Sequence, residues 1–194
     1  MPETWLVVGL GNPGPRYERT RHNIGQLVVD ELADRRREAF RAHKANARVA
    51  ETWSRPGGSR LILAKPNSFM NVSGGPASGL ASYYRVEPDR VVVVHDDLDL
   101  PYDTIKLKVG GGHGGHNGVR DVAKALGTAE FPRVRVGIGR PPGSKDPADW
   151  VLDEFGATER QTLPILVSDA ADAVELLVDG GLLAAQQRFH APRL

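Results

Sequence analysis

Short apolar runs alternate along this chain with segments whose apolar residues recur at helical spacing. Residues 5–8 and 91–94 are uninterrupted apolar runs, which is typical of strands buried on both faces of a sheet. Residues 24–32 place isoleucine, leucine and valine every three or four positions, which predicts a helix. The same contrast predicts further strands over residues 48–52, 60–64, 104–109 and 133–138, and further helices over residues 77–84, 119–126, 161–177 and 182–189.

Polar residues suited to capping precede two of these helices. Asn23 precedes the first helix and has Gln26 three residues later, as in a capping box. Asn117 precedes the helix that Gly127 is placed to end. Alternating strands and helices predict an α/β fold: a single domain over residues 1–194, arranged as a three-layer sandwich with a mixed, twisted β-sheet flanked by helices. Sites in such folds usually lie in the loops after the carboxyl ends of the strands.

Composition excludes several kinds of site. The chain has no cysteine, so it offers no disulfide, no thiolate metal site and no cysteine nucleophile. Its first residues lack a basic run followed by an apolar stretch, and no segment approaches the roughly 20 apolar residues that span a bilayer. We therefore expect a cytoplasmic protein with no membrane contact.

Charge is unevenly distributed along the chain, although the net charge is only +1. Residues 101–145 carry 8 Lys and Arg against 3 Asp and Glu, whereas residues 146–194 carry 3 against 9. A basic middle segment fits a surface that meets phosphates. It fits equally well an uneven solvated surface.

Four polar side chains follow predicted strands or precede predicted helices. Asn12 follows the first strand, Asp96 follows the valine run, and His22 and Asn117 lie at helix starts. The positive end of a helix disfavours imidazolium, so we expect His22 to be neutral and able to accept a proton. Asp96 could bond one ring nitrogen and leave the other facing a water molecule. The alternative is that His22 is only a capping or surface residue and that Asp96 is only a cap or turn residue.

Residues 110–118 contain six glycines in nine positions. Ordering so many glycines costs considerable chain entropy, which is justified where the backbone must approach a ligand closely. This segment could bind a phosphate at the start of the next helix, or it could be a flexible lid.

Together these stretches resemble the bacterial peptidyl-tRNA hydrolase family. The resemblance runs from the first strand to at least Gly139, and its motifs occur in the family's order. They are residues 8–14, Tyr17 with residues 20–25, residues 65–66 with 69–71, residues 95–101, residues 110–118 and residues 133–139.

The resemblance implies hydrolysis of the ester bond between a peptide and tRNA. It implies that His22 is the general base, that Asp96 orients and polarises it, and that Asn12 helps to distinguish a blocked peptidyl group from a free aminoacyl group. Asn71 and Asn117 would hold the peptide backbone and the scissile carbonyl.

The resemblance also implies how the substrate is held. The residues that line the cleft around the peptide and the tRNA 3′ end would be Tyr17, Phe69, Met70 and His116, and those that meet the tRNA phosphates would be Lys106, Lys108 and Arg135. The family is monomeric and uses neither metal nor cofactor.

The chain departs from the family pattern in two places. Asp97 stands where many members have Glu, a change that should leave the role of Asp96 intact. Residues from about 146 to 194 match only loosely, so no functional residue is carried over from them, and they could form a helical lid and C-terminal helices.

Three alternatives fit parts of the sequence. A dinucleotide-dependent oxidoreductase would use Gly9, Gly11 and Gly14 as its fingerprint, but Pro13 and Pro15 flank the last glycine, where a helix should begin. A non-catalytic RNA-binding module is disfavoured by the 6% of aromatic residues and the absence of a long basic stripe.

The third alternative is a metallohydrolase whose ligands are His113, His116, Asp96 and Asp99. Glycines between the two histidines would leave these ligands poorly oriented for a metal.

Overall fold

A computed structural model of the chain describes residues 2–190, and within them a mixed sheet of seven strands forms the centre. The strands are β1 (Thr4–Gly9), β2 (Arg41–His43), β3 (Ala47–Trp53), β4 (Arg60–Pro66), β5 (Val91–Asp97), β6 (Ile105–Val109) and β7 (Pro132–Gly137). Their order is β2-β3-β4-β1-β5-β7-β6. The central strands β4, β1, β5 and β7 are parallel, and the pairs β2–β3, β3–β4 and β6–β7 are antiparallel.

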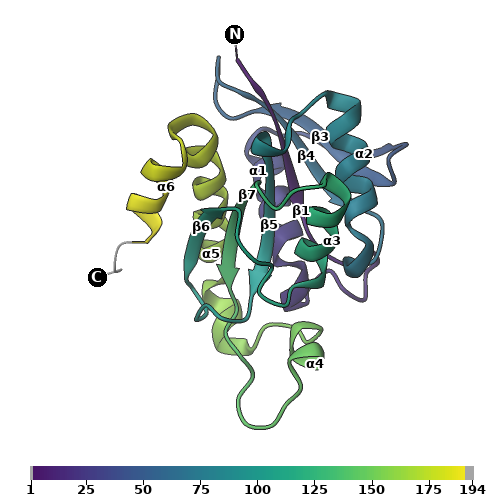
Figure 1. Cartoon of the computed structure of the whole chain (residues 1–194). Helices are drawn as coiled ribbons and strands as arrows, with labels where there is room; N and C mark the ends of the chain where they lie inside the picture. The colour runs from purple at the N-terminus through teal and green to yellow at the C-terminus, as the bar shows by residue number, and fades with distance from the viewer. Residues whose placement is uncertain (1, 191–194) are drawn as a thin grey trace.

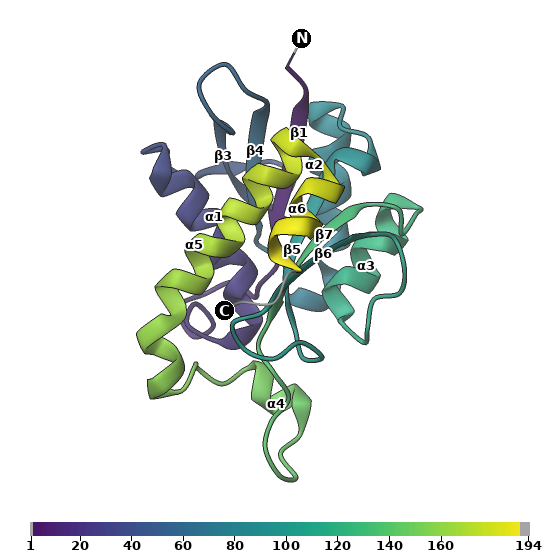
Figure 2. The same ribbon diagram turned by 90° about the vertical axis from the view of Figure 1, so that its left-hand side faces the viewer.

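Helices cover both faces of this sheet (Figures 1 and 2). They are α1 (Ile24–Arg35), α2 (Gly74–Tyr84), α3 (Asn117–Leu126), α4 (Pro147–Val151), α5 (Ala157–Gly180) and α6 (Leu182–Phe189). One hydrophobic core lies between the sheet and α1, α5 and α6, and a second lies between the sheet and α2 and α3. The short α4 lies beyond the end of the sheet (Figure 1). The predicted three-layer α/β sandwich with a mixed sheet is therefore confirmed.

The valine run of β5 is explained by this layering. Val92 and Val94 pack into the core under α1 and α5, and Val91 and Val93 pack into the core under α2 and α3. Because side chains alternate along a strand, a strand covered on both faces must be apolar at every position. The run ends where the polar residues at the carboxyl end of β5 begin.

Two glycines allow α1 to lie directly against the sheet. A Cβ atom on Gly25 would lie 2.2 Å from the carbonyl oxygen of Val94, and one on Gly9 would lie 2.4 Å from the carbonyl oxygen of Gly25. Neither position has room for a side chain. This contact brings the start of α1 to the carboxyl ends of β1 and β5.

Two of the expected helix caps differ in the structure. The side chain of Asn23 makes no capping bond, so the predicted capping box does not form. The cap of α3 is His116 rather than Asn117, because its Nδ1 atom accepts hydrogen bonds from the backbone N–H groups of Gly118 and Val119 at 3.1 and 3.3 Å. The end of α3 at Gly127, which has a φ of +74°, is as predicted.

Three short 3₁₀ turns complete the described chain: η1 (Arg21–Asn23), η2 (Met70–Val72) and η3 (Pro88–Arg90). The first two place polar residues at the carboxyl end of the parallel strands. Among residues 2–190, no helix has the length and apolar character needed to cross a membrane.

Candidate active site

Asn12 is fixed just beyond the end of β1 by three hydrogen bonds. Asn23 accepts from the N–H of Asn12 and donates to its carbonyl oxygen, both at 2.9 Å. The Oδ1 atom of Asn12 accepts from the N–H of Met70 at 2.7 Å. These bonds orient the amide, and its Nδ2 group makes no hydrogen bond to any described residue. Asn12 therefore offers a free donor at the wall of a cavity.

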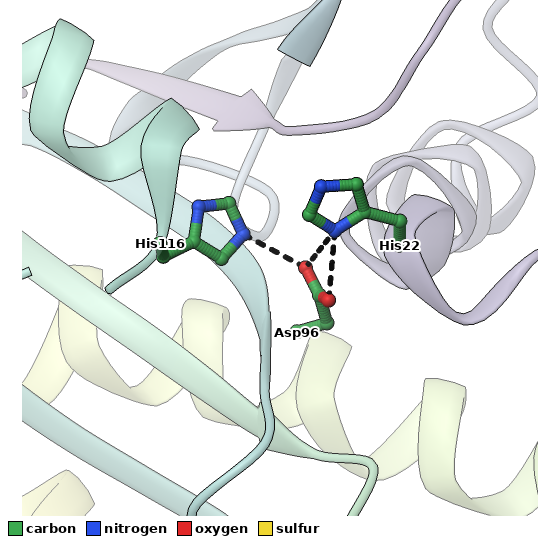
Figure 3. Close-up of side chains that lie close together, drawn as sticks. All are labelled: His22, Asp96 and His116. Carbon is green, nitrogen blue, oxygen red and sulfur yellow. Dashed lines mark hydrogen bonds and ion pairs between the residues drawn. The ribbon is translucent and has the colours of Figure 1, made fainter. Parts of the chain in front are cut away.

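Asp96 and His22 both line this cavity, and their side chains point toward each other (Figure 3). Asp96 follows the valine run on β5 and is buried, with 2% of its side chain exposed. The Nδ1 atom of His22, in η1, lies 2.8 Å from Oδ2 and 3.0 Å from Oδ1 of Asp96. A carboxylate accepts only, so a neutral His22 carries its proton on Nδ1 and keeps a lone pair on Nε2. The expected juxtaposition of these two residues is present.

His116 holds the same carboxylate from the opposite side (Figure 3). Its Nε2 atom lies 2.8 Å from Oδ1 of Asp96. Because its Nδ1 atom accepts two backbone N–H bonds at the start of α3, the proton of the ring must lie on Nε2. His116 is therefore a neutral donor to Asp96, a more specific contact than the cleft-lining position expected from the sequence.

Asp96 governs the protonation of His22. Burial lowers the pKa of His22, but the charge and the hydrogen bond of Asp96 together raise it by more than burial lowers it. The pKa of His22 therefore lies above 6.5. The positive end of the helix therefore does not decide this protonation, contrary to the sequence-based expectation. Burial raises the pKa of Asp96, whereas His22 and His116 lower it more, so the carboxyl group stays ionised.

His95 lies beneath the site and was not predicted from the sequence. Its Nδ1 atom donates to the backbone carbonyl oxygen of Asp96 at 2.7 Å, and its ring lies 4.9 Å from that of His116 in an edge-on arrangement. Burial, followed by the neighbouring His116, lowers the pKa of His95 to about 3. His95 is thus a neutral support for the backbone of Asp96.

The cavity, called the crevice below, has a volume of about 460 Å³. Its apolar lining contains Phe69, Met70, Leu98, Val151 and Leu152, and its polar lining contains Asn12, His22, Asn71, Asp96, His116 and Asn117. Polar groups that converge in a mainly apolar cavity are typical of a small-molecule or catalytic site.

Two predicted cleft residues lie at the mouth of the crevice. Phe69 lines it and is 56% exposed, while the ring of Tyr17 lies 6.3 Å from that of Phe69 in an edge-on contact. Tyr17 is therefore adjacent to the lining residues and is not one of them.

The predicted phosphate-binding cations lie on the antiparallel pair β6–β7, outside the crevice lining. Lys106 is paired in register with Arg135, and Lys108 with Arg133, so all four side chains project from one face. Arg133 is buried and donates to the carbonyl oxygens of Gly111, Gly112 and Ala129, so it holds the glycine-rich loop. Lys108 donates to Gly112 as well, at 3.0 Å.

Asp97, the residue that departs from the family pattern, contacts this cationic face. Its Oδ2 atom accepts from Nε of Arg135 at 2.9 Å. Among the described residues, Asp97 forms no hydrogen bond or ion pair with His22 or His116, so its shorter side chain affects the contact with Arg135 and not the carboxylate of Asp96.

His22, Asp96 and His116 each have an atom that could bind a metal ion, and these atoms lie within 4.8 Å of one another. This is the one candidate metal-binding group found among residues 2–190. A neutral histidine binds a metal through a lone pair. His116 Nε2 would have a lone pair free for a metal only if the ring proton were on Nδ1. Nδ1 cannot carry that proton, because it accepts hydrogen bonds from two backbone N–H groups. This group of residues does not fit a divalent metal ion.

The metal ligands considered from the sequence are not brought together as a set. His113 is exposed and accepts from the N–H of Gly115, and Asp99 pairs with Arg140 at 2.6 Å. The dinucleotide fingerprint also fails, because Gly14 lies in a loop with a φ of +103° and α1 begins only at Ile24.

A sequence model of the peptidyl-tRNA hydrolase family matches residues 6–194. The chain belongs to the peptidyl-tRNA hydrolase family. Relatives with that name include one from Leifsonia xyli subsp. xyli, 63% identical over 190 residues that make up 98% of each chain. Another, from Kineococcus radiotolerans, is 59% identical over 197 residues, or 99% of this chain and 100% of that one.

Solved structures of the peptidyl-tRNA hydrolase family share the whole fold. The crystal structure of peptidyl-tRNA hydrolase from Acinetobacter baumannii has a TM-score of 0.89 and 34% identity, and the match covers 100% of this chain and 97% of that one. The sequence-based assignment to this family is confirmed. The match extends to the C-terminal segment that the motifs covered only loosely.

Proposed function

We propose that this protein hydrolyses the ester bond between a peptide and the 3′ end of tRNA, with His22 as general base. Membership of the peptidyl-tRNA hydrolase family carries the reaction and the substrate. One observation carries the role of His22: Asp96 holds Nδ1 at 2.8 Å, while Nε2 makes no hydrogen bond to a described residue and belongs to a side chain that lines the crevice.

In this mechanism, Nε2 of His22 takes a proton from a water molecule as the water oxygen attacks the ester carbonyl carbon. The carbonyl oxygen becomes an oxyanion in the tetrahedral intermediate. When the intermediate collapses, the bond to the ribose 3′ oxygen breaks, and His22 returns the proton to that oxygen. The Asp96 carboxylate stabilises the imidazolium between the two steps.

Amide groups supply the remaining polar contacts in the proposal. Asn12 lines the crevice and its Nδ2 group makes no hydrogen bond to a described residue, so it could donate to the peptide. This free donor supports a role for Asn12 in distinguishing a blocked from a free aminoacyl group. Asn71 and Asn117 are exposed residues of the crevice wall, where their amides can donate to a peptide carbonyl or to the oxyanion.

The tRNA would approach from the mouth of the crevice. The exposed ring of Phe69 and the half-buried ring of Tyr17 offer aromatic surface for the 3′ end, and Met70 lines the crevice beside Asn12. Lys106, Lys108 and Arg135 would meet phosphates farther along the acceptor stem. We further propose a cytoplasmic monomer that acts without a metal; the proton positions on His116 support the last point.

A comparison of N-acetyl-aminoacyl-tRNA with unblocked aminoacyl-tRNA tests the proposal. We expect rapid ester cleavage of the blocked substrate only. His22→Ala should lower kcat by about 10²–10⁴-fold with little effect on tRNA binding. His43→Ala, a histidine on β2, is the matched control and should keep wild-type turnover. Near-wild-type kcat in His22→Ala would exclude it as the base.

A further inference from the structure

A buried arginine beside the proposed general base joins η1, called the catalytic turn below because it carries His22, to one wall of the crevice. Arg21 precedes His22 in η1, and only 3% of it is exposed. Its guanidinium carbon lies 3.4 Å from the centroid of the Trp150 ring. One guanidinium nitrogen donates to Glu159 Oε1 at 2.9 Å, and another donates to the carbonyl oxygen of Trp150 at 3.4 Å.

Backbone contacts reinforce the same junction. The N–H of Arg21 donates to the carbonyl oxygen of Asp153 at 3.0 Å, and Thr20 forms an isolated antiparallel bridge with Glu154. The indole N–H of Trp150 donates to the carbonyl oxygen of Gly139 at 3.0 Å. Segments that are more than 120 residues apart in sequence therefore meet at Arg21.

The segment held by Arg21 forms part of the crevice. Pro147, Ala148, Val151 and Leu152, called the α4 wall below, all line it. The helix α4 has only five residues, and so short a helix has little stability of its own. Its position must come from tertiary contacts, among which those of Arg21 lead directly to the turn that carries His22.

The chemistry of the contact points to positioning rather than to simple burial. Removing a guanidinium from water is costly, and Nε of Arg21 is buried without a partner among the described residues. An apolar side chain could fill this space without that cost. A planar cation, however, fixes the face of an indole and the direction of a carboxylate at the same time.

We propose that Arg21 is a positioning residue that sets the α4 wall against the catalytic turn and so determines how tightly the acyl part of the substrate is held. The inference rests on the proposed function, since the crevice must receive that acyl group. Arg21 touches neither His22 Nε2 nor Asp96 in any hydrogen bond, so its effect should fall on substrate binding rather than on proton transfer.

The test is steady-state hydrolysis of N-acetyl-aminoacyl-tRNA by Arg21→Met and Arg21→Lys. We expect KM to rise about tenfold in Arg21→Met, while kcat and its pH midpoint stay near wild-type values. Arg21→Lys should be intermediate, because lysine keeps the charge near Glu159 but loses the planar stacking on Trp150. An unchanged KM, or a fall in kcat alone, would overturn the inference.

Arg35→Met is the matched control. Arg35, the last residue of α1, joins this helix to α5 through Asp172, Glu175 and Ser168. None of these partners belongs to the α4 wall. We expect a lower melting temperature and an unchanged KM. An equal rise in KM for Arg35→Met would show that general destabilisation explains the effect, and would overturn the inference.

A second variant keeps the inference testable if Arg21→Met does not fold. Trp150→Leu removes the other partner of the stack and should also raise KM, whereas a wild-type KM would contradict the proposal. If both variants fold, the double variant should have nearly the KM of either single variant, because the two residues act as one contact. Wild-type turnover, measured alongside, tests the proposed function independently.

Discussion

The Nδ1 atom of His22 lies 2.8 Å from Oδ2 of Asp96, and this contact gives the imidazole a raised pKa as well as a fixed proton. The raised pKa makes His22 a stronger base. It also means that His22 becomes charged, and so unable to accept a proton, at a higher pH than an isolated histidine would.

The first prediction concerns the pH dependence of kcat. Because only neutral His22 accepts a proton, kcat should rise with pH through a midpoint above 6.5. Asp96→Asn removes the charge that raises the pKa, so the midpoint should move to lower pH, and kcat should fall by about 10²–10⁴-fold as the proton is no longer fixed. Rates between pH 5 and 9 measure both effects.

Asp99→Asn is the control for that experiment, since Asp99 pairs with Arg140 and neither residue lines the crevice. It should keep the wild-type midpoint. A midpoint that stays in place in Asp96→Asn would refute the assignment of the pKa shift to Asp96.

The second prediction concerns the contact between α1 and the sheet. A Cβ atom on Gly25 would lie 2.2 Å from the carbonyl oxygen of Val94, so Gly25→Ala must push the start of α1 away from β5. We expect a loss of about 1–3 kcal/mol in the free energy of unfolding and a fall in kcat, because His22 moves with the helix. Urea unfolding and turnover measure the two.

Gly75→Ala in α2 separates this effect from the general cost of changing a helical glycine. A Cβ atom there would meet nothing within 4 Å. The substitution should leave kcat unchanged and should stabilise the protein slightly, by up to about 1 kcal/mol. Equal behaviour of the two alanine variants would contradict the steric argument.

The third prediction concerns salt. If Lys106 meets a phosphate, Lys106→Met should weaken binding of all tRNAs similarly and should reduce the slope of log KM against log salt by about one. Arg90→Met, at the other end of the β5 strand, should retain the wild-type slope. A slope that Lys106→Met leaves unchanged would remove this residue from the proposed tRNA surface.

The fourth prediction concerns stability in acid. Below pH 6.5 the unfolded chain binds a proton at His95, whereas the folded chain keeps this residue neutral down to about pH 3. As the pH falls from 6.5 toward 3, His95 should therefore reduce the free energy of unfolding by about 1.4 kcal/mol for each unit that the pH falls. His22 has the opposite shift, so its stabilising contribution is complete below pH 6.5 and adds no slope there.

Urea unfolding at pH 6.0 and 5.0 tests this prediction in the wild-type protein and in His95→Asn. The variant should lose less stability between the two pH values. Equal losses would show that His95 is not the group responsible.

Much of the fold could be predicted because its determinants are local. The valine run of β5 and the apolar spacing of α1 are visible in a few residues each. The strand β2 was not predicted, because three residues, Arg41–His43, with no buried side chain give no alternating pattern. It forms because β3 offers it a partner.

The site could be predicted in outline but not in its supports. The contact between His22 and Asp96 could be predicted, because both residues lie in loops next to predicted strands or helices and both match motifs of the family. Nothing in the sequence showed that Asn23 would hold Asn12 rather than cap α1, or that Arg21 would reach Trp150. These roles depend on segments far apart in the chain, and short-range patterns carry no information about them.

The cap of α3 shows the same limit in one residue. Histidine is not among the preferred capping residues, since its Nδ1 atom accepts only when the proton lies on Nε2. Asp96 supplies the reason for that proton position, and Asp96 is 20 residues away.

This double use of His116 links two events that are usually separate. If the first turn of α3 frays, the ring is released, and Asp96 loses one of its two imidazole donors. Conversely, a substrate that draws the ring away leaves two amides at the helix start without an acceptor. Local unfolding at this one turn should therefore weaken the support of Asp96 and lower the activity of the enzyme while the rest of the molecule stays folded.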